Sequence, residues 1–271
     1  MITAGCDVGS MTAKAVIMRD NSIIGSAVAL TGHVSEKAAI EVMERAIQKA
    51  GISMDDITCC VGTGYGRKNV PFAAARESEI ACHAKGAVWQ APTVRTIIDI
   101  GGQDAKAVRI DNAGKVLRYL YNDKCASGTG RFLEIIAEAL DIDLAEMGDL
   151  SKRATEKLTL SNQCVIFAET EIISLVNEGK EIPDIVNALH HAVASRAASM
   201  AKSIVVEPDV AMTGGVAKNA GMFDALGSAL DTELVKIEHP QINGAIGAAL
   251  LARELCGTDT DSDTAGSPAR L

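Results

Sequence analysis

The stretch AGCDVGSMTAKAVIM (residues 4–18) decides the fold, because it occurs twice in the chain. The second copy is TIIDIGGQDAKAVRI (residues 96–110), in which Asp99 matches Asp7 and the run Ala-Lys-Ala-Val recurs. Every match is separated by 92 residues. Similarity at one fixed offset indicates a duplicated structural unit. The sequence therefore predicts two related lobes.

The same order of elements surrounds both copies. An apolar strand enters a glycine-containing turn, a second strand leaves it, a third short strand follows, and a helical pattern then begins. The first predicted helix has Ile40, Met43 and Ile47 at helical spacing, with Ser35 as a candidate N-cap. The second begins near Thr129. A hairpin, a third strand and a helix, present twice, predict an α/β fold.

The remaining sequence predicts the elements that complete each lobe. Further strands are expected at residues 56–62, 209–215 and 233–238, and helices at 72–89, 183–205, 217–230 and 243–255. We expect lobe I to span residues 1–95 and lobe II to span residues 96–256, with the last helix a candidate to pack back on lobe I. The polar residues 257–271 are expected to form a disordered tail.

The composition excludes several classes of partner. A hydrophobic content of 48% supports a proper core, and a net charge of −9 argues against nucleic acid or an anionic membrane as partner. No apolar run approaches the ~18 residues of a membrane span. The first ten residues lack the basic and apolar regions of a signal peptide. We therefore expect a cytoplasmic protein with no nucleic-acid or membrane partner.

The seven cysteines do not form a recognisable disulfide or zinc pattern. Their number is odd, their spacing is wide and no C-x-x-C occurs. Four lie in apolar strand or helix patterns and are expected in the core: Cys6, Cys59, Cys60 and Cys82. Cys125 differs, because it lies in the small, polar, glycine-rich stretch NDKCASGTG directly before a helical pattern.

Two Asp-x-Gly turns are candidate phosphate sites. Glycine lets a phosphate approach the backbone closely, and a carboxylate at a strand end can hold Mg²⁺ through water. Asp7 and Asp99 occupy such positions, and two facing copies would clamp one nucleotide. Ordinary hairpins remain the alternative for either copy alone. The P-loop pattern G-x-x-x-x-G-K-[ST] is absent.

Three further glycine-containing stretches stand out. Gly214 and Gly215, in TGGVAKNAG, would let the chain pass close to an adenine and ribose, although a helix-entry turn is also compatible. Small residues at helical spacing in residues 243–252 fit either a pivot between lobes or plain tight packing. The loop GTGYGRK, residues 62–68, receives no role from its sequence.

The order of these motifs resembles that of the actin, hexokinase and Hsp70 superfamily. Within it, the chain resembles the BadF/BadG/BcrA/BcrD-type ATPases over residues 1 to about 255. The most specific stretches are GTGYGR, DIGGQDAK, NDKCASGTGRF and TGGVAKN. The resemblance implies a two-lobed actin/hexokinase/Hsp70-like ATPase fold made of duplicated ribonuclease H-like lobes. Such proteins are activators of 2-hydroxyacyl-CoA dehydratases or ATPase subunits of benzoyl-CoA reductases, and our interpretation leans slightly to the reductase.

The resemblance also implies roles in binding ATP or ADP with Mg²⁺. The run Ser10, Met11, Thr12, Ala13 and Lys14 would cradle phosphates, and Asp7 and Asp99 would position Mg²⁺ through water. The phosphate-2 and adenosine segments would contribute Gly101, Gly102, Gly214 and Gly215. Gln103 and Asp104 are candidates for orienting or activating the attacking water.

The cluster cysteines of the family fall on Cys125 and Cys164. A 4Fe–4S cluster usually takes four thiolates, and this chain offers two, 39 residues apart. Two chains would therefore share one cluster across a two-fold or pseudo-two-fold interface. The helix start after Cys125 favours its thiolate form. The implied partners are a second copy or a homologous ATPase subunit, a ferredoxin as electron donor, and an iron–sulfur reductase or dehydratase component.

Two other functions stay open at this point. A small-molecule kinase, such as a sugar kinase, uses the same fold, and fold does not determine function. It would need a hydroxyl-binding pocket and a catalytic base but neither Cys125 nor Cys164. A non-catalytic nucleotide-sensing partner would bind ATP without hydrolysing it.

Overall fold

The computed structural model describes residues 1–161 and 164–262, with side chains as far as residue 257. The chain forms two compact units. Unit 1 comprises residues 1–86 and the chain from residue 242 onward, and unit 2 comprises residues 87–241. Helix α2 (Glu79–Gln90) therefore runs from one unit into the other, whereas the lobe boundary expected from the sequence follows residue 95.

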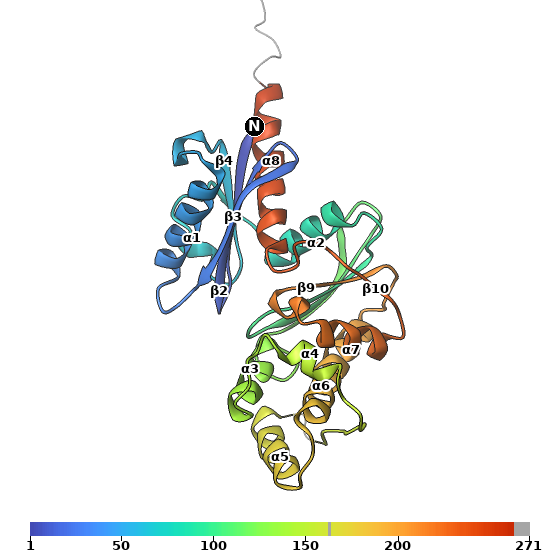
Figure 1. The fold of residues 1–271 in the computed structure, drawn as a ribbon. Helices are drawn as coiled ribbons and strands as arrows, with labels where there is room; N and C mark the ends of the chain where they lie inside the picture. Colours follow the sequence, from blue (N-terminus) through green and yellow to red (C-terminus); the bar gives the residue numbers. More distant parts are fainter. Residues whose placement is uncertain (162–163, 263–271) are drawn as a thin grey trace, which may run out of the picture. The chain divides into compact units, whose positions relative to one another are not determined.

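Unit 1 is built on a five-stranded sheet in the order β3-β2-β1-β4-β5. Its strands are β1 (Ile2–Val8), β2 (Thr12–Arg19), β3 (Ser22–Leu30), β4 (Cys59–Thr63) and β5 (Ala75–Arg76). The first three are antiparallel, while β4 is parallel to β1 and β5 is parallel to β4. Helix α1 (Ser35–Ala50) packs on β2 and β3, and helix α8 (Asn243–Ser262) packs on β1 and β4. Figure 1 shows α8, at the end of the sequence, beside β1 at its start.

Unit 2 repeats this architecture with a longer set of helices. Its sheet has the order β10-β9-β6-β7-β8. The strands are β6 (Thr96–Ile100), β7 (Ala105–Ile110), β8 (Val116–Asn122), β9 (Val210–Thr213) and β10 (Leu234–Val235). The helices are α3 (Gly130–Ala139), α4 (Met147–Ser151), α5 (Val165–Asn177), α6 (Ile182–Ser203) and α7 (Ala220–Leu230). Each sheet thus has an antiparallel three-strand meander and two added parallel strands, which confirms the predicted duplicated α/β fold.

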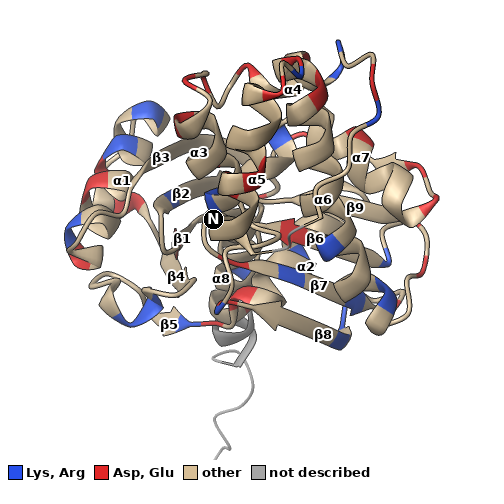
Figure 2. Cartoon of the chain, turned by 90° about the horizontal axis from the view of Figure 1, so that it is seen from below, with Lys and Arg blue, Asp and Glu red and all other residues tan. Residues whose placement is uncertain are grey.

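Mainly aliphatic side chains form a separate core in each unit, in keeping with an aromatic content of only 3%. In α1 the buried positions Ala38, Val42, Met43 and Ala46 lie on one face of the helix. Charged side chains cover the other face, where Figure 2 shows acidic and basic residues interspersed. Alternation of this kind is typical of a helix packed on a sheet with one face in water. No helix of the described chain is both long and apolar enough to cross a lipid bilayer.

Three local predictions were wrong. Val34, and not Ser35, is the N-cap of α1, and the Ser35 hydroxyl instead accepts a 2.6 Å hydrogen bond from Asn69 Nδ2. The helix expected from residue 72 begins only at Glu79, because β5 first pairs with β4. Helix α8 continues through Gly257 to Ser262, since a single glycine inside a helix costs only about 1 kcal/mol. The rest of the expected tail, residues 263–271, lies outside the described residues.

His190 is a fully buried polar residue in the middle of α6. Asn219 accepts from Met222 N with its Oδ1 and so caps α7, which leaves its Nδ2 to donate to His190 Nε2 at 3.2 Å. The proton of the neutral imidazole therefore lies on Nδ1. Among the residues that the structure describes, Nδ1 has no hydrogen-bond partner. Burial lowers the pKa of His190 from its ordinary value of 6.5 to about 4.

This shift predicts a loss of stability in mild acid. Between pH 6.5 and about 4 the unfolded chain binds a proton at His190 that the folded chain does not bind, so the free energy of unfolding falls as the pH falls. The contribution amounts to about 3 kcal/mol over this window. Urea unfolding at several pH values should show a weaker pH dependence for His190→Gln than for wild type. The exposed neighbour gives the control His191→Gln, and equal slopes for all three proteins would contradict the assignment.

Candidate functional site

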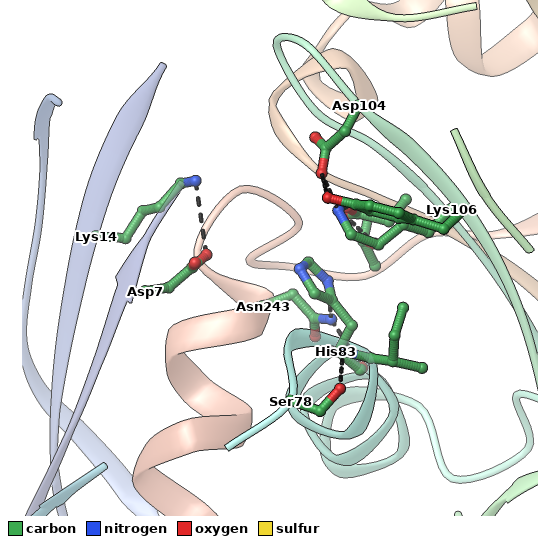
Figure 3. A network of polar contacts seen from close by, with 11 residues as sticks. Asp7, Lys14, Ser78, His83, Asp104, Lys106 and Asn243 are labelled. Carbon is green, nitrogen blue, oxygen red and sulfur yellow. Dashed lines mark hydrogen bonds and ion pairs between the residues drawn. The ribbon is translucent and has the colours of Figure 1, made fainter. Parts of the chain in front are cut away.

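In unit 1 a buried carboxylate lies at the end of the central strand. Asp7 is opposite Lys14 on β2 and opposite Thr63 on β4. Lys14 Nζ lies 3.6 Å from Asp7 Oδ2, and the Asp7 residue is only 5% exposed (Figure 3). A buried carboxylate needs such a partner, because an isolated charge is costly to remove from water. Lys14 therefore compensates the burial of the Asp7 carboxylate near the end of the strand.

Two glycines confine the Asp7 carboxylate. Gly64 follows β4 with φ of 85°, and a Cβ there would lie 2.4 Å from Asp7 Oδ1. A Cβ at Gly244, in the first turn of α8, would lie 3.0 Å from Asp7 Oδ2. Gly66 N also donates to Val8 O at 2.8 Å. The loop 62–68, to which its sequence gave no role, thus packs directly against the predicted magnesium-positioning carboxylate.

The turn between β1 and β2 is closed and braced by main-chain groups. Gly9 N donates to Thr12 O at 3.0 Å. Thr31, directly after β3, donates from its N to Met11 O at 2.9 Å and from its Oγ1 to Gly9 O at 2.8 Å. Both ends of the turn are therefore fixed by one threonine.

The run predicted to cradle phosphates divides into two parts. Ser10, Met11 and Thr12 are partly exposed at the turn. Ala13 is fully buried in the core of unit 1, so it could meet a phosphate only through its main chain. The Lys14 side chain points towards the turn, because a Cβ added at Gly9 would lie only 3.2 Å from Lys14 Nζ.

Unit 2 has the equivalent arrangement with one more carboxylate. Asp99 is opposite Lys106 on β7 and Thr213 on β9. Lys106 Nζ lies 3.1 Å from Asp99 Oδ2 and 2.5 Å from Asp104 Oδ2 (Figure 3). Thr213 Oγ1 donates to Asp99 Oδ1 at 2.7 Å, and Tyr121 OH donates to Asp104 Oδ2 at 3.3 Å. Lys106 is almost fully buried, so both carboxylates neutralise it.

The turn between β6 and β7, which we call the phosphate-2 turn after its predicted role, is joined to the start of α3. Gly101 N donates to Asp104 O at 2.9 Å and closes the turn. The carbonyl oxygens of Gly101 and Gly102 then accept from Gly130 N at 2.9 Å and from Arg131 N at 2.7 Å. Of the two predicted catalytic residues, Gln103 is exposed at this turn, whereas Asp104 is held by Lys106.

The glycines of the predicted adenosine segment differ from each other. Gly214 has φ of 88°, and a Cβ there would lie 2.2 Å from Ile100 O, so only glycine fits. At Gly215 the Cα is open to a ligand, because among the described residues beyond its chain neighbours only Gln241 comes within 4 Å of such a Cβ. Gly64 and Gly214 each follow a threonine that lies opposite the aspartate of its own unit.

Cys125 lies in an exposed loop between β8 and α3. Asn122 holds this loop, since its Nδ2 donates to Cys125 O at 2.8 Å and its Oδ1 accepts from Cys125 N at 3.3 Å. Thr129 closes the loop from the other side by donating its Oγ1 to Ala126 O at 2.7 Å. The thiol is thus presented by a loop with fixed ends.

Cys164 is exposed and is the N-cap residue of α5. Buried residues of α5 and α3, among them Val165 and Phe132, belong to one hydrophobic core. The two exposed cysteines therefore precede helices that share a core. Among the described residues no group of three or more His, Cys, Asp or Glu side chains could hold a metal ion.

The five remaining cysteines lie in unit 1 and are in a different environment. Cys6, Cys59, Cys60 and Cys82 are buried, as predicted, whereas Cys256 is partly exposed. Burial raises the pKa of Cys60 and of Cys82 to about 12, and also raises the pKa of Cys6. These three stay protonated at neutral pH and are poor metal ligands, because the thiolate is the binding form.

The model of the BadF/BadG/BcrA/BcrD ATPase family matches residues 4–252. The chain belongs to this family. It is 45% identical to the activator of lactoyl-CoA dehydratase from Anaerotignum propionicum, over 94% of this chain and 98% of that one. It is 33% identical to a benzoyl-CoA reductase subunit from Thauera aromatica, over 92% of each chain. The solved activator of 2-hydroxyisocaproyl-CoA dehydratase from Clostridium difficile, with bound ADPNP, matches with a TM-score of 0.93 and 40% identity, covering 99% of this chain and 100% of that one.

In this member of the ATPase family, three polar residues beside the two aspartates and a fourth at the β1–β2 turn were not predicted from the sequence. Lys106 could have been found, because it lies 92 residues after Lys14 in the same repeat. Thr63 and Thr213 share the dipeptide Thr-Gly, a signal too short to stand out alone. Thr31 has no sequence signal, since its role depends on β3 ending beside the β1–β2 turn.

The exposure of the thiols predicts their reactivity. Brief treatment of the apoprotein with iodoacetamide at pH 8, followed by peptide mass spectrometry, should label Cys125 and Cys164 first. Cys60 and Cys82 should react at least ~100-fold more slowly, because they are buried and their thiolate fraction is small at that pH. In urea all cysteines should react at similar rates, and equal labelling in the folded protein would contradict the structure.

Proposed function

We propose that the chain is the ATP-hydrolysing, electron-transferring activator of a 2-hydroxyacyl-CoA dehydratase. The observation that carries this proposal is the 45% identity to a dehydratase activator along nearly the whole of both chains. Identity to the benzoyl-CoA reductase component is lower, at 33%. The comparisons therefore favour the dehydratase, whereas our interpretation of the motifs alone slightly favoured the reductase. A role in a benzoyl-CoA reductase is the second candidate.

We assign the residues of each unit to a defined part of the Mg²⁺–ATP complex. Asp7 and Asp99 would hold Mg²⁺ through water, which is compatible with their burial and with a lysine beside each. The turn residues from Ser10 and the ammonium of Lys14 would contact phosphates. Gly214 and Gly215 would border the adenosine. Together these residues would position and neutralise phosphate charge, which is most of what an ATPase site must do.

The attacking water would be oriented mainly by Gln103. This side chain is exposed at the phosphate-2 turn and is uncharged, like the glutamine that orients water in several GTPases. Asp104 is paired with Lys106, so its carboxylate is less available as a base than the sequence implied. We assign Asp104 to holding Lys106 and closing the turn that presents Gln103.

For an iron–sulfur cluster, Cys125 and Cys164 fit one half of a site. Both are exposed, and each precedes a helix start that favours an anionic ligand. A bound 4Fe–4S cluster would supply one-electron redox chemistry at low potential, with the electron coming from a ferredoxin. A second copy of the chain would supply the other two thiolates. Ile166 and Phe167, two and three residues after Cys164 and each more than 60% exposed, would provide apolar surface for that copy.

A short route of hydrogen bonds connects the phosphate-2 turn with the cysteine loop. The carbonyls of Gly101 and Gly102 hold the N–H groups of Gly130 and Arg131, and the loop of Cys125 ends at Thr129. A change of nucleotide at the turn would thus reach the loop that presents Cys125. Hydrogen bonding and exposure both tune cluster potentials, so the coupling has a physical basis. We place this chemistry in the cytoplasm.

Iron content tests this proposal directly. Protein purified without oxygen should be brown and hold about four iron atoms per two chains. Cys125→Ser and Cys164→Ser should each lose most of the iron, since a half-site with one thiolate cannot hold the cluster, while the control Cys256→Ser should keep it. A colourless wild-type protein that phosphorylates a small molecule would instead support the kinase. Full iron in Cys125→Ser would contradict the assigned ligands.

A further inference from the structure

The chain passes between the two units at two places. The first is inside α2, between Gly86 and Ala87, and the second is between Gln241 and Ile242, directly before α8. Within unit 1 these two passages touch each other. A Cβ at Gly86 would lie 2.2 Å from Asn243 O, so the first residue of α8 packs on the backbone of α2. We call this contact the joint.

His83 is the side chain that links α2 to α8 at the joint. Asn243 Nδ2 donates to His83 O at 3.0 Å and lies 3.3 Å from His83 Nδ1 (Figure 3). Both residues are buried. An amide nitrogen can only donate, so Nδ1 accepts and the proton of the neutral imidazole lies on Nε2. Asn243 therefore fixes both the orientation and the tautomer of the ring.

The opposite edge of this ring faces the site of Asp7. A Cβ at Gly244 would lie 3.0 Å from His83 Nε2 and also 3.0 Å from Asp7 Oδ2. The imidazole and the carboxylate consequently border the same small space above the Gly244 Cα, and glycine is the residue that leaves that space free. The edge of the ring that carries a proton thus borders the carboxylate that is proposed to hold Mg²⁺ through water.

We propose that His83 is a positioning residue for the Mg²⁺–nucleotide chemistry at Asp7, and that it connects this carboxylate with the joint. Its Nε2 side limits the positions that the Asp7 carboxylate can take, and its Nδ1 side is held by Asn243 at the passage between units. A change at Asp7 on binding Mg²⁺ and nucleotide is thereby transmitted to α2. This inference rests on the proposed function only in assigning Mg²⁺ to Asp7.

Two variants and two readouts test the proposal. His83→Leu removes both ring nitrogens, and His83→Gln keeps a donor at a similar position. Residues that orient a metal-holding group affect metal affinity about 10- to 100-fold, so the KM for Mg²⁺ in ATP hydrolysis should rise at least about tenfold in His83→Leu and less in His83→Gln. The kcat at saturating Mg²⁺ should change much less. A loss of packing alone would not raise the KM for Mg²⁺ while sparing kcat, and glutamine would not partly restore that KM.

The second readout is the fluorescence of Trp89, which is the single tryptophan of the chain and lies on α2 six residues after His83. Mg·ADP should change the Trp89 emission of wild type, and His83→Leu should reduce this change at least threefold. Gly244→Ala should act like His83→Leu, because its methyl group fills the space between ring and carboxylate. Gly257→Ala, on the same helix, is the matched control, because no atom of the described residues lies within 4 Å of a Cβ there.

Several results would overturn the inference. An unchanged KM for Mg²⁺ in folded His83→Leu would remove the link to Asp7. An unaltered Trp89 response to Mg·ADP in both His83→Leu and Gly244→Ala would remove the link to the joint. If His83→Leu does not fold, His83→Gln must still raise the KM for Mg²⁺. Wild type that binds Mg·ADP but does not hydrolyse ATP would contradict the proposed function, while the Trp89 titration would still test His83.

Discussion

The structure depends on a cross-strand pair between a buried aspartate and a lysine. In each unit the aspartate is the penultimate residue of the central strand and the lysine lies opposite it on the next strand, as Asp7 and Lys14 do in unit 1. The pair fixes the hairpin register, because a slip of one residue would turn the lysine to the other face of the sheet. The closed turns, the close glycines and the threonine on the neighbouring parallel strand all surround this buried pair.

Much of this arrangement could be predicted from the sequence, because it is duplicated. A fixed offset of 92 residues identified both hairpins and both aspartates, and the same offset contains Lys106. The division of the cysteines was also predictable, since Cys125 lies in a polar loop and Cys60 in an apolar strand. What could not be predicted are contacts between distant segments. The approach of Gly64 to the Asp7 carboxylate depends on β4 lying beside β1, which no local spacing shows.

Errors in the predicted elements have the same origin. The residues before Glu79 have a helical pattern, yet two of them pair with β4 as a short strand, because the sheet of unit 1 accepts one more edge strand. His83 was not selected from the sequence, since one histidine in an apolar helix is usually a core residue. Its significance comes from Asn243 and Gly244, which lie about 160 residues away in the sequence and beside it in the fold.

The central claim is that both aspartates serve one Mg²⁺-dependent ATPase reaction. The most direct measurement is the steady-state rate of ATP hydrolysis by Asp7→Asn and Asp99→Asn, each compared with wild type and with the surface control Asp224→Asn. Because each substitution removes the charge that would hold the Mg²⁺ shell, each should lower the rate by about 100-fold or more, with folding retained. A wild-type rate in either variant would contradict the account.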